Sequence, residues 1–385
     1  MINYHIIKSA YAAPKNTDFC LFKQRKTIVD KTFFNKKLSG LDVRFEAQKI
    51  AFAPVVFQGV RLLWKMGILA VLSKDAKAGL TPKQIAKKTD VSTYGATVLL
   101  ETGLSAGVVD LVDDEKYIIT RLGNFVLGDK MTQINFNFNN DVCYQGMFYL
   151  EEAIRKEQPA GLKVFGTWPT VYDALSKLPD TAQKSWFDFD HFYSDSAFNE
   201  ALPIVFKDMP AKIMDVGGNT GKWSLRCLNY NPDVRMTIID LPGQLEKARE
   251  NIDTAGYGDR FDGKAVNILD DSSKLPVGHD TIWMSQFLCC FKETEIVSIL
   301  KKAAKAMDQN TKLFIMDTYW DRQPYDIASY CLINTSPYFT AMANGNSRMY
   351  RSKTMQDCIR KAGLTLLEDT DELGLSHTLM LCKLK

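Results

Sequence analysis

The feature that most constrains this chain is a glycine-rich turn, Asp215-Val-Gly-Gly-Asn-Thr-Gly221. An apolar run ending at Ile213-Met214 precedes it, and the helix-compatible segment Lys222-Trp-Ser-Leu-Arg-Cys-Leu228 follows. This order predicts a strand, a tight turn and a helix. Glycines at such a turn let the backbone bend sharply and approach a bound ligand closely.

A carboxylate follows at the spacing that a nucleoside ligand requires. The run 234–239 predicts a second strand, and Asp240 ends it about 20 residues after the first glycine. At the tip of that strand, the carboxylate can accept hydrogen bonds from ribose hydroxyls. The pattern therefore predicts a cofactor of the adenosine type.

The composition excludes several classes of protein. The apolar fraction of 46% and charged fraction of 24% are ordinary for a globular chain. A net charge of +3 is too small to indicate nucleic acid by itself, and no apolar run reaches the roughly 18 residues of a membrane span. Ala10-Tyr-Ala-Ala13 has the small residues of a signal-cleavage site, but His5 and Lys8 interrupt the apolar stretch before it. We therefore expect a cytoplasmic protein.

The cysteines and histidines do not predict a metal site, because no CxxC pair and no His/Asp cluster at ligand spacing occurs. We expect the cysteines to be small buried residues in a reducing compartment. They are Cys20, Cys143, Cys227, Cys289, Cys290, Cys331, Cys358 and Cys382.

The length allows two domains, and residues 1–125 predict the first as a winged-helix module. A helical pattern covers 47–72, Thr81 caps a second helix with Pro82 at its first position, and Ser92 opens a third. The runs 108–112 and 117–120 then predict a small hairpin. Residues 31–37, rich in lysine and phenylalanine, are a partner-facing arm or a capping helix in this interpretation.

A winged-helix module can bind DNA or form a dimer. Its candidate recognition helix, 92–102, contains no Lys or Arg. A helix that enters the major groove needs positive charge and base-reading side chains. We therefore predict a dimerisation module, a homodimer and no nucleic-acid partner.

Residues 126–205 predict a mostly helical region that lies between the two domains and is rich in aromatic residues. Some of its aromatic side chains are expected to line an apolar pocket, since small-molecule sites often form between domains.

Residues 206–385 alternate strands and helices, which predicts a parallel sheet with helices on both faces. The expected strands are 212–216, 234–239, 262–268, 281–285, 312–318, 364–368 and 378–383. The last two are separated by a short turn near Gly374, which only an antiparallel hairpin permits.

This combination resembles the class I S-adenosylmethionine-dependent methyltransferases. More narrowly, it resembles the O-methyltransferase family of plant caffeate and hydroxyindole enzymes and bacterial polyketide and carotenoid enzymes. The resemblance covers roughly residues 45–385. It is carried by the glycine motif at 215–221, Asp240-Leu-Pro242, Gly258-Asp-Arg260 and Leu275-Pro276, in this order and followed by the terminal hairpin. It implies a Rossmann-like seven-stranded sheet preceded by a mainly α winged-helix dimerisation domain.

The resemblance also implies the cofactor and its site. The cofactor would be S-adenosyl-L-methionine and the product S-adenosyl-L-homocysteine. Asn267 stands where family members typically carry Asp, and its carbonyl can still accept a hydrogen bond from the exocyclic amine of adenine. The cofactor residues implied are Asp215, Gly217, Gly218, Gly221, Asp240, Leu241, Asn267, Ile268, Ser285 and Gln286.

The chain departs from the family at the general base. The family's fourth strand runs into a Leu-His-Asp-Trp-like segment, whereas this chain reads Gln286-Phe-Leu-Cys-Cys-Phe291, with Cys289 at the histidine position. A phenol has a pKa near 10 and is barely ionised at neutral pH, and a positioned base contributes about 10²–10⁴-fold to the rate. Cys289 can serve as the base only if its thiolate is stabilised, and otherwise lines the pocket. The other candidates are His191, in the helical region over the pocket, and Asp317, at the end of the fifth strand.

Three mechanisms remain open from the sequence: O-methylation with His191 or Asp317 as base, transfer by proximity alone to a substrate that is already nucleophilic, and cofactor binding without transfer. A cofactor-sensing regulator is a further alternative. We expect a methyltransferase that acts on a small aromatic or polyketide-like acceptor, at oxygen.

Overall fold

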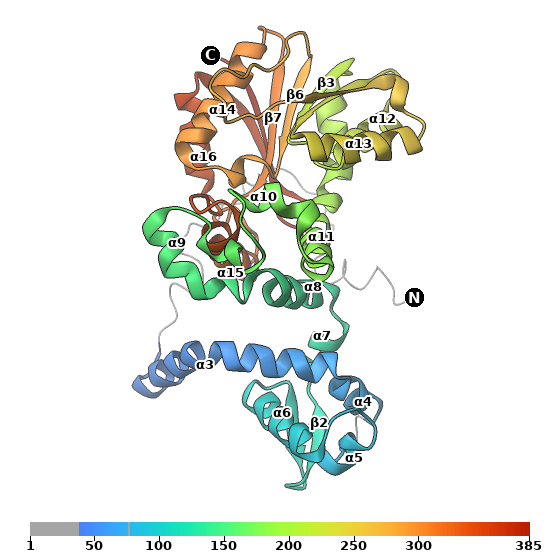
Figure 1. Ribbon diagram of the computed structural model, residues 1–385, viewed down its shortest axis with the longest axis vertical. Coiled ribbons are helices and arrows are strands. Elements are labelled where there is room, and N and C mark those ends of the chain that lie inside the picture. The colour runs from blue at the N-terminus through green and yellow to red at the C-terminus, as the bar shows by residue number, and fades with distance from the viewer. Residues whose placement is uncertain (1–37, 76–77) are drawn as a thin grey trace, which may run out of the picture.

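The computed structural model describes residues 38–75 and 78–385. The segment 31–37, named above as an arm or capping helix, lies outside the described residues, as do His5 and Cys20. The described chain forms an N-terminal module, a helical middle and a C-terminal sheet domain, which lie one after another along the longest axis (Figure 1).

The N-terminal module has the helices and hairpin that the sequence predicts. The Thr81 hydroxyl accepts a hydrogen bond from the Gln84 N–H at 3.3 Å, and the Gln84 side chain accepts one from the Thr81 N–H at 2.8 Å, so the capping box is complete. Ser92 caps the next helix by accepting from the Gly95 N–H at 3.0 Å. The elements are α3 (Gly40–Lys65), α4 (Ile68–Lys74), α5 (Pro82–Ala86), α6 (Thr93–Ser105), β1 (Val109–Val112) and β2 (Lys116–Ile119).

The expectation of one helical run over 47–72 was wrong in one respect, because the chain breaks between α3 and α4. Gly67 has φ of +76°, a left-handed conformation that ends α3 and that glycine adopts without a steric cost. The periodic apolar positions continue across the break, since Leu63 and Ile68 are both fully buried in the same core. Periodicity alone therefore could not reveal it.

The helical middle joins the N-terminal module to the sheet domain. It includes α7 (Arg121–Gly128), α8 (Lys130–Phe138), α9 (Leu150–Lys156), α10 (Val171–Ala174), α11 (Asp180–Val205) and α15 (Asp326–Tyr338). Helix α3 runs alongside this region (Figure 1), and the Tyr144 hydroxyl donates to the Pro54 carbonyl at 2.9 Å. Gln58 and Asn140 add a side-chain hydrogen bond of 2.9 Å.

The C-terminal domain is a seven-stranded sheet with the strand order β5-β4-β3-β6-β7-β9-β8. The first five strands in this order are parallel, and β9 pairs antiparallel with both β7 and β8. The predicted terminal hairpin is thus confirmed. The strands are β3 (Lys212–Val216), β4 (Arg235–Asp240), β5 (Phe261–Ala265), β6 (Thr281–Ser285), β7 (Lys312–Thr318), β8 (Leu364–Leu373) and β9 (His377–Leu384).

Two expected strand boundaries were wrong. Strand β5 ends at Ala265 rather than at 268, because the Asn267 side chain accepts the Leu269 N–H at 3.1 Å and turns the chain. Strand β8 continues to Leu373 rather than stopping at 368, and it does so through register shifts against β9. Alternation of apolar and polar residues is lost at such irregularities.

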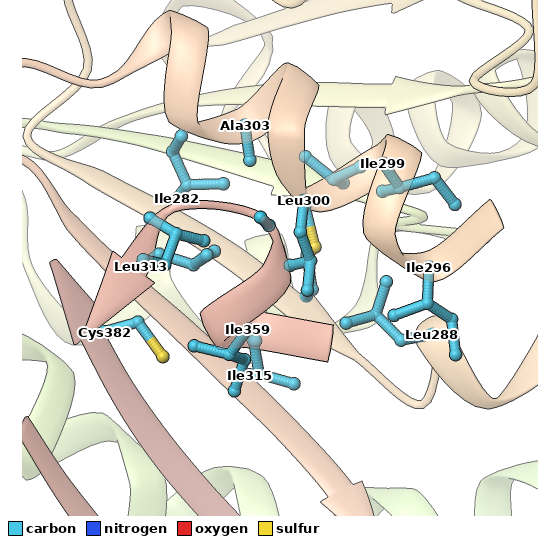
Figure 2. Close-up of a cluster of buried hydrophobic side chains, with 14 of the residues drawn as sticks. Ile282, Leu288, Ile296, Ile299, Leu300, Ala303, Leu313, Ile315, Ile359 and Cys382 are labelled. Atoms are coloured by element: carbon cyan, nitrogen blue, oxygen red, sulfur yellow. The ribbon is translucent and has the colours of Figure 1, made fainter. Parts of the chain in front are cut away.

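Helices cover both faces of the sheet (Figure 1). On one face, α12 (Lys222–Tyr230), α13 (Pro242–Thr254) and the end of α11 pack around Trp223 and Trp283, whose rings stack at 3.9 Å. On the other face lie α14 (Glu293–Ala306) and α16 (Ser352–Lys361). Figure 2 shows this second core, in which Leu288, from the segment after β6, packs among aliphatic side chains of α14, α16 and the sheet. The core therefore anchors the loop that carries Cys289.

Among the described residues, no single helix is long and apolar enough to cross a membrane. Only α3 and α4 taken together meet those criteria, across a bend of 58°.

Burial of His377 predicts a pH-dependent stability. His377 is 0% exposed, neither ring nitrogen has a hydrogen-bond partner among the described residues, and burial lowers its pKa to about 4. Since the unfolded chain binds this proton near pH 6.5 and the folded chain only near pH 4, stability falls as the pH drops through that window. The loss amounts to about 3 kcal/mol.

The variant His377→Leu removes this titration. The free energy of unfolding is measured in urea at pH 7 and at pH 4.5. Between these two pH values, we expect it to fall by about 2–3 kcal/mol more for the wild type than for the variant. Equal losses for the two proteins would contradict the assignment.

Candidate functional site

The glycine turn lies between β3 and α12 and is packed closely against neighbouring side chains. Gly217 and Gly221 have φ of +77° and +79°, a region that L side chains rarely adopt. A Cβ at Gly217 would overlap the ring of Phe287, which follows β6. The Gly217 N–H donates to the Ile239 carbonyl at 2.8 Å, so the turn is held against β4. The turn is therefore a fixed surface that a ligand can approach closely.

Asp240 connects the tip of β4 to this turn. Its Oδ2 accepts the Asn219 N–H at 2.8 Å, and its Oδ1 accepts the Leu241 N–H at 2.7 Å. Burial raises the pKa of Asp240, while these two hydrogen bonds lower it. Each oxygen keeps a lone pair, so the oriented carboxylate can still accept hydrogen bonds from a diol.

Asp215 supports the turn from beneath. It is 2% exposed, and its Oδ2 accepts the Ser224 hydroxyl at 2.7 Å, which ties β3 to α12. Burial raises the pKa of Asp215 to about 7. A Cβ at Gly218 would meet this carboxylate, so the packing of the motif requires glycine there.

Asn267, Ile268, Ser285 and Gln286 lie where their parallel strands end, on the same edge of the sheet as the glycine turn. Gln286 has φ of +46°, and its Nε2 is buried without a hydrogen-bond partner among the described residues. Strain and an unpaired buried amide are typical of binding sites. The turn, the oriented acid and this amide lie at one edge of the sheet, and their chemistry fits an adenosine-type cofactor with a polar tail.

Cys289 and Asp317 contact each other at the end of β6 and β7. Cys289 lies in a short 3₁₀ turn (Leu288–Cys290), and its N–H donates to Asp317 Oδ2 at 3.2 Å. Its hydrogen bond with Cys290, followed by burial, raises the pKa of the Cys289 thiol well above its ordinary value. Burial raises the pKa of Asp317 to about 6. At neutral pH the thiol is protonated and the carboxylate is charged, so Asp317 is the better base of the two.

His191 lies on α11, with its ring 5.6 Å from that of Phe187. Its Nε2 is buried without a hydrogen-bond partner in the described part of the chain, and burial lowers its pKa, which keeps the imidazole neutral. The charged groups that face it are Lys222, Asp195 and Asp188. It is therefore placed beside the N-terminus of α12 and the glycine turn.

Sequence reasoning missed two charged residues in this corner of the site. Lys222, the first residue after the glycine turn, forms an ion pair of 2.9 Å with Asp195 of α11. Burial raises the pKa of Asp190 to about 6, and Lys222 and Asp195 both face it. Lys222 could have been found from its position next to Gly221. Nothing in the sequence places Asp190 there, since the packing of α11 on α12 is a long-range contact.

Many aromatic residues of the helical middle belong to one apolar cluster that includes Cys289. Within it, the rings of Phe138 and Phe189 stack at 4.0 Å, and Trp186 Nε1 donates to the Tyr338 hydroxyl at 2.6 Å. Trp168, Tyr172, Phe187, Phe189, Cys290 and Met349 are partly buried against it. Partly exposed aromatic side chains therefore lie beside the Cys289–Asp317 pair.

Metal-assisted chemistry has no candidate site in residues 38–75 and 78–385. No group of three His, Cys, Asp or Glu side chains there could hold an ion. The cysteines in this part of the chain are all free thiols.

Comparison with known families identifies both parts of the chain. The O-methyltransferase domain family matches residues 148–365, and the Dimerisation2-like domain family matches residues 44–117. The first match covers the α11 segment, the glycine turn and the Cys289–Asp317 pair.

Two curated proteins and one solved structure illustrate the relationship. The L-tyrosine C(3)-methyltransferase of Streptomyces lavendulae is 23% identical over 82% of this chain and 85% of its own length. The bacteriochlorophyllide d C-20 methyltransferase of Chlorobaculum tepidum is 28% identical over 72% of this chain and 80% of its own length. The O-methyltransferase NcsB1 from neocarzinostatin biosynthesis, in complex with S-adenosyl-L-homocysteine and 1,4-dihydroxy-2-naphthoic acid, has the same fold. It covers 86% of this chain and 96% of its own, with a TM-score of 0.62 at 17% identity.

Proposed function

We propose that this chain, which belongs to the O-methyltransferase domain family, transfers the methyl group of S-adenosylmethionine to a phenol-type oxygen of a small aromatic or polyketide-like acceptor. The observation that carries the proposal is that Gly217, Asp240 and Gln286 lie at the same edge of the sheet as a buried carboxylate, Asp317. When bound, S-adenosylmethionine supplies an electrophilic methyl group on its sulfonium. The protein must orient the acceptor and remove its proton.

The cofactor of this methyltransferase is S-adenosylmethionine, and the residues that hold it are part of the proposal. Gly217, Gly218 and Gly221 give the methionine moiety and ribose access to the backbone, supported by Asp215. Asp240 accepts hydrogen bonds from the ribose hydroxyls, and Leu241 lies beside it. Asn267 and Ile268 border adenine, and Ser285 and Gln286 lie near the sulfonium.

The aromatic cluster supports a flat apolar acceptor. Partly exposed rings, among them Trp168, Tyr172 and Phe187, lie beside Cys289 and offer stacking surfaces rather than the charged groups that a sugar or phosphate would need. The solved relative NcsB1 holds a dihydroxynaphthoic acid, which is of the same chemical class.

Asp317 is the proposed proton acceptor. Its pKa of about 6 leaves it ionised at neutral pH, and it lies in contact with the position where the family carries its histidine. His191 is neutral and can position or deprotonate an acceptor from the other side of the site. Cys289 is a lining residue in this proposal.

Transfer to a ring carbon is the second candidate. A phenolate is nucleophilic at its oxygen and at the carbons ortho and para to it, so the same proton acceptor serves both reactions. Two observations favour it: the family's base position carries a thiol, and the two curated relatives named above transfer methyl to carbon by their names.

The test is calorimetric titration with S-adenosylmethionine and S-adenosylhomocysteine, followed by a screen of phenols, naphthols and polyenes in which the site of methylation is read by mass spectrometry and NMR. Binding of both ligands with an O-methylated product supports the proposal. A C-methylated product replaces it with the second candidate. Binding without any product after a broad screen would support a scaffold or regulator, and no binding would overturn the cofactor assignment.

Substitution of Cys289 by serine tests the role of the thiol. We expect Cys289→Ser to change kcat by less than about fivefold, because the thiol is protonated and serves neither as base nor as nucleophile. Steady-state rates with the acceptor found above measure this. A loss of 100-fold or more would instead identify the thiol as catalytic.

The exposed apolar side chains of α3 support a homodimer. Large apolar side chains along this helix are exposed to solvent, and the Dimerisation2-like match includes most of it. Apolar patches of this kind mark protein–protein interfaces. The residues are Leu41, Val43, Phe45, Ile50, Phe52 and Val55.

A further inference from the structure

We propose that Lys302 is a positioning residue for the cofactor, because its buried ammonium group shapes the loop 267–273 that borders adenine. This inference rests on the proposed placement of the cofactor beside Asn267 and Ile268. Lys302 is not part of the glycine motif and is not among the cofactor residues that the family resemblance implies.

The ammonium group of Lys302 lies inside the loop as if it were a bound cation. Lys302 is on α14 and is 9% exposed. Its Nζ donates to the carbonyl of Ile268 at 2.7 Å, to the hydroxyl of Ser273 at 2.9 Å and to the carbonyl of Asp270. An ammonium group has three donors, and all three are used. A buried charge is tolerated only when it is satisfied in this way.

The loop itself consists of short turns. The Asn267 side chain accepts the Leu269 N–H at 3.1 Å, the Asp270 N–H donates to the Asn267 carbonyl at 3.1 Å, and the Ser273 N–H donates to the Asp270 carbonyl at 3.0 Å. These bonds are internal to the loop. Ile268 and Leu275 pack into the core near its two ends. From α14, Lys302 donates hydrogen bonds to the polar part of the loop that lies between these two buried residues.

The direction of the Ile268 carbonyl decides what the loop presents to a ligand. Since this carbonyl faces Lys302, the peptide between Ile268 and Leu269 is fixed, and the Leu269 N–H is directed to the Asn267 side chain. That contact orients the side-chain amide of Asn267, whose oxygen is proposed to accept a hydrogen bond from the exocyclic amine of adenine. Without the ammonium, two backbone carbonyls would lose a charged partner and the turn would relax, so selectivity for adenine should fall together with affinity.

The test compares Lys302→Met with Lys301→Met, the exposed neighbour on the same helix. Each folded protein is titrated with S-adenosylhomocysteine and with S-inosylhomocysteine, in which a carbonyl replaces the exocyclic amine. We expect Lys302→Met to weaken S-adenosylhomocysteine binding by about tenfold or more and to reduce the preference for it over the inosyl analogue. Lys301→Met should leave both values at the wild-type level.

A milder variant keeps the test decisive if Lys302→Met does not fold. Ser273→Ala removes one of the three acceptors and should reduce affinity and the adenine preference by about threefold. Unchanged preference in the folded variants would overturn the inference, as would a wild-type protein that binds both ligands equally. A wild type that binds neither ligand would instead overturn the proposed function.

Discussion

Replacement of Gly217 by valine should abolish cofactor binding while leaving the protein folded. The backbone at Gly217 has φ of +77°, and forcing a side chain into a left-handed conformation costs about 1–2 kcal/mol. A Cβ there would also overlap the ring of Phe287, so the turn and the segment after β6 cannot both keep their positions. We expect the affinity for S-adenosylhomocysteine to fall by about 100-fold or more.

Gly243→Ala is the matched control. Gly243 is in the first turn of α13, its backbone is helical, and a Cβ there meets no atom within 4 Å. Alanine favours a helix over glycine, so this variant should bind S-adenosylhomocysteine as the wild type does. Calorimetric titration of both variants, with circular dichroism to verify folding, gives the comparison. Wild-type affinity in a folded Gly217→Val protein would show that the glycine turn is not the cofactor site.

The sequence was sufficient to predict the parts of the fold that depend on local chemistry. The glycine turn, the caps at Thr81 and Ser92, and the order of strands and helices all follow from residues near one another in the chain. Asp240 was predicted from its spacing after the glycine turn, and the family resemblance implied the same site for Gln286. Both follow parallel strands, whose carboxyl ends meet at one edge of a sheet.

Other features of the site depend on contacts between distant segments, and these could not be predicted. The sequence identifies Lys302 only as one of several lysines on an amphipathic helix, yet its ammonium is buried 29 to 34 residues away from its acceptors in the chain. Likewise, Asp190 and Lys222 face each other only because α11 packs on α12. The break at Gly67 was missed for a different reason, since a positive φ is compatible with an unbroken apolar period.

Replacement of Asp317 by asparagine should remove catalysis and leave cofactor binding intact. Asparagine has the same shape but cannot accept the proton of an acceptor hydroxyl, so we expect kcat to fall by about 10²–10⁴-fold. The dissociation constant of S-adenosylhomocysteine should stay within about twofold of the wild type. Asp321→Asn, which changes a carboxylate that accepts hydrogen bonds from Ser352 outside the site, serves as the control.

The pH dependence distinguishes a proton acceptor from a residue that only supports the loop. Burial raises the pKa of Asp317 to about 6, so its basic form is lost as the pH falls through that value. Single-turnover rates of the wild type should therefore drop about tenfold per unit below pH 6 and level off above it, while the residual rate of Asp317→Asn should lack this limb. A variant that keeps the limb would show that another group, with His191 as the first candidate, accepts the proton.

Stability measurements on the same variant complete the argument. A carboxyl whose folded pKa lies above its unfolded value stabilises the fold only at low pH, and that contribution is lost as the pH rises through about 6. At pH 7 the charged Asp317 therefore costs the fold free energy, which the hydrogen bonds from the Cys289 and Thr318 N–H groups offset only in part. Asparagine removes the buried charge, which stabilises the fold, but its NH₂ group then faces one of those N–H groups, so one hydrogen bond is lost. We expect these two effects on the free energy of unfolding to cancel to within about 2 kcal/mol. A loss of activity at nearly unchanged stability would mean that the charge is retained at this position for chemistry rather than for folding.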